Sequence, residues 1–192
     1  MGYSAEHVER TRERILASAA RLFRRKGFDA AGIDEIMAGA GLTRGGFYAH
    51  FQSKADLFAA VLGEELEFAA RLRSAREGVP DASDAAALHA IRHYLAPDQL
   101  PRIAAGCTMV ASAADIARAP KRARKAFTDG FESLVDEFEH LAGGPERRAQ
   151  ALAAVATCVG GVALARTFTD PSLAEALLAA CHEVIEAQLG RS

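Results

Sequence analysis

GIDEIMAGAGLTRGGFYAHFQSK, residues 32–54, has the pattern of two short helices joined by a tight turn. Apolar residues give each helix an inner face: Ile33, Ile36 and Met37 in the first, Phe47 and Phe51 in the second. Gly41 suits the left-handed turn residue between them, and Thr43 suits the N-cap of the second helix. The pattern predicts a helix-turn-helix, whose second helix normally enters the major groove of DNA.

The composition around this motif is that of a soluble globular protein, because half of the 192 residues are apolar and a quarter are charged. Charges interrupt the apolar runs, so we expect no membrane span. The N-terminal MGYSAEHVERTRER has no apolar core, which argues against a signal peptide and for a cytoplasmic location. Residues 1–56 carry nine Lys and Arg against seven Asp and Glu, whereas the remainder carries 14 against 18. This asymmetry suits a DNA-binding head on an acidic body.

Helical periodicity runs through the whole chain without a strand pattern, so the predicted fold is all-α. A first helix over about residues 5–26, ending before Gly27, would brace the motif in a three-helix N-terminal domain, residues 1–56. Residues 57–192 would form a C-terminal helical bundle. The boundary would fall inside the long helix that begins near Ser53, a residue that can cap it, rather than in a loop.

Two stretches, ILASAARLFRRKGFDA (residues 15–30) and IDEIMAGAGLTRGGFYAHFQSKADLF (residues 33–58), resemble the DNA-binding domain of the tetracycline-repressor (TetR) family of bacterial regulators. The resemblance is specific because of the spacing of Thr43, Tyr48, His50, Phe51 and Lys54. Gly32 departs from the family pattern, which usually has Ser or Thr at this helix start. Because Gly is tolerated at an N-cap, the departure costs only about a few tenths of a kcal/mol.

Six residues of the motif are candidates for contacting DNA: Thr43, Arg44, Gly45, Tyr48, His50 and Lys54. Arg44 can reach guanine O6 and N7 from the start of the second helix, and a phosphate contact or a solvated side chain is weighed equally. Gly45 would let the backbone approach the groove, and Thr43 can donate to a phosphate while it caps the helix. The resemblance implies phosphate contacts for Tyr48, His50 and Lys54. Tyr48 could instead belong partly to the core.

The same resemblance implies a homodimer on a palindromic DNA operator, released by a small-molecule effector that binds in the C-terminal helices. A repressor is favoured over an activator on family grounds. The placement of aromatic and neighbouring side chains suggests pocket walls, although any of them could be plain core: Phe68, His89, Tyr94, Met109, Phe127 and Phe131. The sequence does not identify the effector.

The last two predicted helices are rich in Ala and Gly, including Gly160 and Gly161. Such a pair, doubled by a two-fold axis, makes a four-helix bundle, and the resemblance implies a dimer interface there. The predicted interface residues are Leu152, Val155, Val159, Val162, Leu177, Cys181 and Val184. The alternative is that the small residues pack within one chain.

The sequence gives less support to an enzymatic, metal-binding or redox-sensing function. No enzyme motif such as GxSxG, a P-loop or HExxH is present, and we expect neither a cofactor nor a metal. His89 and His93 have metal-ligand spacing but no third ligand nearby in sequence, and Cys158 and Cys181 fall on apolar stripes typical of a core. Two alternatives stay open: a regulator that senses oxidants through Cys107, and a small-molecule-binding protein whose head no longer binds DNA.

Overall fold

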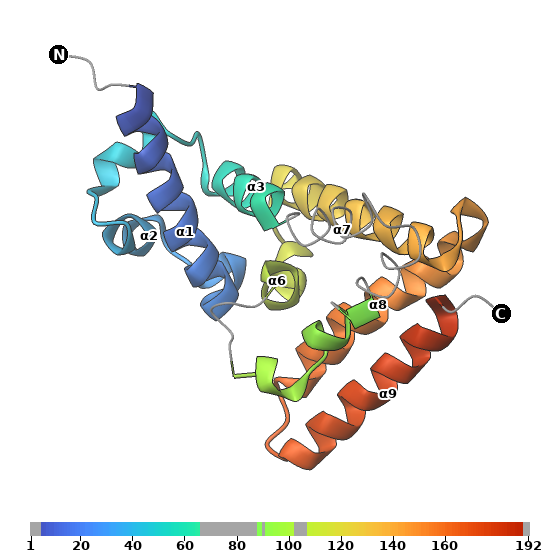
Figure 1. Cartoon of the computed structure of the whole chain (residues 1–192). Helices are drawn as coiled ribbons and strands as arrows, with labels where there is room; N and C mark the ends of the chain where they lie inside the picture. The colour runs from blue at the N-terminus through green and yellow to red at the C-terminus, as the bar shows by residue number, and fades with distance from the viewer. Residues whose placement is uncertain (1–4, 66–87, 90, 102–106, 190–192) are drawn as a thin grey trace. The chain divides into compact units, whose positions relative to one another are not determined.

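The computed structural model describes residues 5–65, 88–89, 91–101 and 107–189. Every regular element within these ranges is helical, which confirms the all-α prediction (Figure 1). The chain divides into two compact units, Met1–Glu64 with Ala104–Thr128 and Glu65–Ile103 with Asp129–Ser192. The functional boundary expected between residues 56 and 57 stays a prediction.

The unit that holds the N-terminus is built on α1, which packs against both α2 and α6 (Figure 1). Its elements are α1 (Ala5–Ala30), α2 (Ile33–Gly39), η1 (Arg44–Ala49), α3 (Lys54–Glu65), α6 (Thr108–Ile116) and the first residues of α7 (Lys121–Ala142). The first helix is interrupted at Gly27, where φ is 78° and ψ is −178°. The regular helix therefore ends where the sequence predicts.

Three buried phenylalanines join α1 to α3. The ring of Phe58 meets Phe23 edge-on at 5.2 Å between centroids and Phe28 edge-on at 5.1 Å. Edge-to-face geometry is a favourable arrangement of aromatic rings, and each ring buries a large apolar area. This cluster packs α3, which follows the helix-turn-helix, against α1, which precedes it.

Gly27 is also the point where α6 comes close to α1. A Cβ at Gly27 would lie 2.1 Å from Asp115 Oδ2 and 3.3 Å from the carbonyl oxygen of Ala111. The same Asp115 oxygen accepts a hydrogen bond from the backbone N–H of Asp29 at 3.3 Å. Gly27 therefore combines a left-handed backbone, which disfavours a side chain, with a close approach of α6 that a side chain would have to displace.

The turn after α2 is held by side chains of α1. Arg14 Nη2 donates to the carbonyl oxygen of Ala40 at 2.5 Å, and the buried Ser18 hydroxyl donates to the carbonyl oxygen of Ile36 at 2.8 Å. Gly41 has a φ of 68°, which confirms the predicted left-handed turn residue. The Ala40 carbonyl lies at the end of a short helix, where intrahelical donors run out, whereas the Ile36 carbonyl also accepts the backbone N–H of Ala40 at 3.1 Å.

The second unit contains an antiparallel pair of helices, α8 and α9, which lie side by side (orange and red in Figure 1). Its described elements are helical residues 91–94, η2 (Pro97–Gln99), the rest of α7, η4 (Pro145–Arg147), α8 (Arg148–Ala165) and α9 (Pro171–Leu189). A Cβ at Gly161 of α8 would lie 2.6 Å from the sulfur of Cys181 on α9. The small residue therefore permits close packing of α8 and α9 within one chain.

Helix α8 is more apolar than the sequence interpretation allowed. The expectation that charges interrupt every apolar run is wrong, because no charged residue occurs from Ala149 to Ala165. The stretch Pro145–Ala165 is long and apolar enough to cross a membrane, with 39% of its apolar window buried. One such helix is weak evidence for a span, since core helices of soluble proteins pass the same test. The observation shows that much of the apolar surface of α8 is uncovered in one chain.

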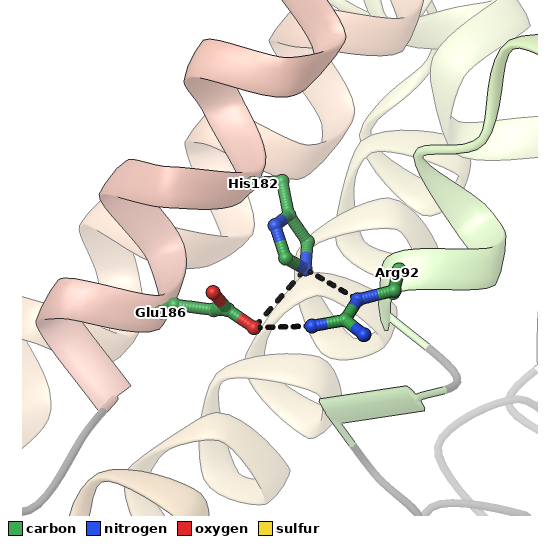
Figure 2. A network of polar contacts seen from close by, with 3 residues as sticks. All are labelled: Arg92, His182 and Glu186. Carbon is green, nitrogen blue, oxygen red and sulfur yellow. Dashed lines mark hydrogen bonds and ion pairs between the residues drawn. The ribbon is translucent and has the colours of Figure 1, made fainter.

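Arg92 connects helical residues 91–94 to α9 (Figure 2). Its Nη2 donates to Glu186 Oε1 at 2.9 Å, and its Nε donates to His182 Nε2 at 3.2 Å. The same Nε2 of His182 lies 3.3 Å from Glu186 Oε1, so each of the three side chains contacts the other two. The three side chains tie the two helical segments together inside the second unit.

Candidate DNA-binding surface

The second helix of the motif is the 3-10 helix η1, six residues from Arg44 to Ala49. Thr43 occupies the predicted N-cap position with φ −85° and ψ 153°, but its hydroxyl makes no capping hydrogen bond. Gly45 and Gly46 fall inside the element, and glycine weakens a regular helix because it loses the most backbone freedom on ordering. The result is a short helix whose N-terminal side chain Thr43 is exposed beside Arg44.

Burial separates the two faces of η1. Phe47 is fully buried and Phe51, just after η1, is nearly so, which confirms their assignment to the core. Tyr48 is 61% exposed, with the edge of its ring against Phe47 at 5.2 Å between centroids. Its hydroxyl-bearing ring therefore lies on the surface with Thr43, Arg44 and Gly45, rather than in the core.

Arg44 forms an ion pair with Asp34, the second residue of α2. Its Nη1 lies 2.7 Å from Asp34 Oδ2 and 3.0 Å from Oδ1. Both side chains are exposed, so the pair contributes little to stability, typically about 0–1 kcal/mol. The sequence interpretation gave Asp34 no role, because residues ten positions apart meet only when the turn at Gly41 folds back.

Lys54 is held by the end of α1, away from the open surface. Its ammonium donates to the carbonyl oxygens of Phe28 at 2.8 Å and Asp29 at 3.1 Å and lies 4.6 Å from the centroid of the Phe28 ring. Burial lowers the pKa of Lys54, against the opposing attraction of Asp29 and Asp115. The ammonium has a further N–H, so the predicted phosphate contact stays a prediction, while a capping role for α1 is an addition.

The remaining motif residues are placed by local bonds. His50 is half-buried at the C-cap of η1, where its backbone N–H donates to the carbonyl oxygen of Phe47 at 3.0 Å. The Ser53 hydroxyl accepts the backbone N–H of Asp56 at 3.1 Å, which confirms the predicted cap of the next helix. Asp56 in turn forms an ion pair with Arg122 at the start of α7.

Comparison with known proteins gives a consistent result. The family model described as "Bacterial regulatory proteins, tetR family" matches residues 15–61. The transcriptional regulator AcrR of Shigella flexneri is 39% identical over 74 residues, which cover 34% of this chain and 34% of AcrR. The crystal structure of SCO4454, a TetR-family transcriptional regulator from Streptomyces coelicolor, is 27% identical with a TM-score of 0.71, covering 94% of this chain and 95% of that one.

Residues 15–61 carry the DNA-binding domain of the TetR family.

The likeness to curated relatives of the TetR family is limited to the head, since the match spans about a third of the length of AcrR. The likeness in fold extends further. A solved complex of SmeT with triclosan has a TM-score of 0.67 at 23% identity, covering 93% of this chain and 90% of that one. At this identity the comparison shows the fold alone.

The predicted effector residues are divided between the two units. Phe68 lies outside the described residues. Met109 and Phe127 belong to the first unit, whereas His89, Tyr94 and Phe131 belong to the second. Met109 is buried, His89 is exposed and the other three are half-buried. The pocket therefore stays a prediction. Within the described ranges, no three His, Cys, Asp or Glu side chains are grouped so as to hold a metal ion.

The predicted dimer residues fall into two classes. Val155, Val162 and Cys181 are buried between α8 and α9 in one chain, and burial raises the pKa of the Cys181 thiol. Leu152 and Val184 are exposed, and Val159 and Leu177 are half-buried. Cys158 is buried as predicted, and Cys107 is half-exposed at the N-cap of α6. Only the exposed and half-buried residues offer surface to a second chain.

Proposed function

We propose that this chain is a cytoplasmic, non-enzymatic transcriptional repressor of the TetR family that binds a palindromic operator as a homodimer and is released by a small-molecule effector. One observation carries the DNA-binding part. Thr43, Arg44 and Tyr48 are exposed together on η1, while Phe47 and Phe51 anchor the same element in the core. A rigidly held element that presents a hydroxyl, a guanidinium and a phenol fits the major groove and its phosphates.

The proposal of a small-molecule effector is supported by a structural relative. SmeT, which shares the fold, is solved with triclosan bound, and this supports a small apolar or aromatic effector for a related scaffold. An effector can release DNA only if it binds the conformation that does not fit the operator better than the one that does. Tyr94 and Phe131, both in the second unit, are half-buried, as pocket walls require.

The test is capture of sheared genomic DNA by the purified protein at near-physiological salt. Enrichment of one palindromic site supports the proposal, and the genes beside that site narrow the chemical class of the effector. No enrichment above random fragments would remove the DNA-binding part. It would favour the alternative of a small-molecule-binding protein with a silent head.

Substitutions at Arg44 and Lys54 should distinguish a contact with a DNA base from a contact with the DNA phosphates. Arg44→Ala is expected to lower the ratio of operator to random-DNA affinity by about tenfold or more, because a bidentate base contact contributes about 1–3 kcal/mol. Lys54→Ala should weaken operator and random DNA alike and lower the salt slope by about one. Fluorescence anisotropy at several salt concentrations measures both quantities. Equal losses on both DNAs for Arg44→Ala would assign that side chain to phosphate binding.

The homodimer is supported by exposed apolar stripes on α8 and α9. On α9, Leu173, Leu177, Ala180, Val184 and Ala187 recur at steps of four and three, and each is exposed or half-buried. On α8, Leu152, Ala156, Val159 and Ala163 follow the same spacing. Stripes of this period form the seams of helix bundles, so a two-fold related copy would complete a four-helix bundle.

Val184→Arg is expected to raise the dimer dissociation constant by about 100-fold, because an unpaired charge buried at a helix seam costs about 3 kcal/mol or more. Analytical ultracentrifugation over a concentration series measures the constant. Ala179→Arg is the matched control, since Ala179 is exposed on α9 about 140° around the helix. If both variants stay dimeric with the wild-type constant, the seam lies elsewhere.

A further inference from the structure

We propose that Asp34 is a positioning residue that orients Arg44 to read a guanine in the operator. The inference rests on the proposed DNA-binding function and adds to it a second residue that determines specificity. The inference is based on the ion pair between Asp34, in the first turn of α2, and Arg44, the first residue of η1.

The pair engages one end of the guanidinium. Only Nη1 of Arg44 contacts Asp34, at 2.7 Å from Oδ2 and 3.0 Å from Oδ1. The N–H groups on Nε and Nη2 point along the other edge of the planar group and make no hydrogen bond among the described residues with either Asp34 oxygen. Two parallel donors are what guanine O6 and N7 require. Asp34 therefore leaves the side edge of Arg44 available for a base.

Because both side chains are exposed, the pair contributes little to the stability of the fold. Arg44 is 62% exposed and Asp34 is 67% exposed, and solvent screens an ion pair of this kind. A lone carboxylate on a surface that approaches phosphates would oppose binding. Paired with Arg44, the charge of the same carboxylate is offset, and a long side chain that would otherwise sample many rotamers is biased toward one of them.

The adjacent residue supplies a control. Glu35 also lies in the first turn of α2, and both of its oxygens accept from Lys26 Nζ, at 2.7 and 2.9 Å. Glu35→Gln therefore removes the same charge as Asp34→Asn, one residue away, without touching Arg44. Any effect of charge alone on DNA affinity should be shared by the two variants.

The experiment uses the operator obtained by genomic capture with the wild-type protein. Affinities of the dimer for the operator and for a scrambled duplex are measured for the wild type, Asp34→Asn, Glu35→Gln, Arg44→Ala and the Asp34→Asn/Arg44→Ala double variant. Operators with each guanine of the half-site replaced in turn identify the base that Arg44 reads.

Asp34→Asn is expected to lower the ratio of operator affinity to scrambled-duplex affinity by about twofold to fivefold, because an exposed ion pair contributes at most about 1 kcal/mol to orienting Arg44. Glu35→Gln should leave the ratio unchanged, and Asp34→Asn should have no further effect on the ratio in the Arg44→Ala background. The discrimination lost in Asp34→Asn should be at the same guanine as in Arg44→Ala.

Two results would overturn the inference. An unchanged ratio in Asp34→Asn would show that Arg44 needs no positioning, and an increased ratio would show that Asp34 competes with DNA for Arg44. Both differ from failure of the proposed function itself, in which the wild-type protein captures no operator and no ratio can be measured.

Discussion

Phe58→Ala is expected to lower the free energy of unfolding of the N-terminal unit by about 3–5 kcal/mol, the usual cost of removing a buried aromatic side chain. Phe58 is completely buried and contacts Phe23 and Phe28 edge-on, so truncation removes both ring contacts and leaves a cavity between α1 and α3. Domains are stable by only about 5–15 kcal/mol, so the loss is a large fraction of the total. Urea unfolding followed by circular dichroism measures it.

Tyr48→Ala is the matched control for Phe58→Ala, because it removes an aromatic ring that is 61% exposed in the same unit. We expect it to change the free energy of unfolding by less than about 0.5–1 kcal/mol while weakening DNA binding. Comparable unfolding curves for the two variants would contradict the assignment of Phe58 to the centre of this core.

Gly27→Ala is expected to destabilise the same unit by about 2–4 kcal/mol. A non-glycine residue at φ 78° costs about 1–2 kcal/mol, and forcing a methyl group into an occupied space costs about 1–3 kcal/mol more. The methyl group would lie 2.1 Å from Asp115 Oδ2, so that carboxylate must move and lose its bond to the Asp29 N–H. Thermal and urea unfolding of the full chain measure the loss.

Two further variants divide the Gly27 effect into its parts. Gly63→Ala places a methyl group in α3 where nothing lies within 4 Å, and it should stabilise by about 0.5–1 kcal/mol. Gly27→Ala combined with Asp115→Ala should recover the steric part and retain the backbone strain. If the combined variant is no more stable than Gly27→Ala alone, the carboxylate can move without cost and backbone strain accounts for the whole effect.

The features predicted correctly from the sequence are those set by neighbouring residues. The left-handed turn at Gly41, the Ser53 cap and the inward-facing Phe47 and Phe51 each follow from spacing within a few positions. Burial of Cys158 between helices was also predictable from its apolar stripe.

The features that escaped prediction join residues far apart in the chain. Asp115 meets Asp29 across 86 positions, and Lys54 reaches the carbonyl of Phe28 across 26. A Cβ at Gly39 would lie 2.4 Å from the Ser18 hydroxyl, so glycine at this position permits close packing of α2 on α1. Helical periodicity shows which face is inward, but it does not say which polar side chain will stand opposite.

The two glycines inside η1, Gly45 and Gly46, have a consequence for how the proposed DNA specificity could change. Neither has a positive φ, a methyl group at Gly45 would meet nothing within 4 Å, and one at Gly46 would meet only Met37 at an ordinary contact distance. Neither backbone nor packing therefore demands glycine there. If η1 reads DNA as proposed, Gly45 and Gly46 are two positions where new base-contacting side chains can be introduced without a change in the packing of the helices beneath them.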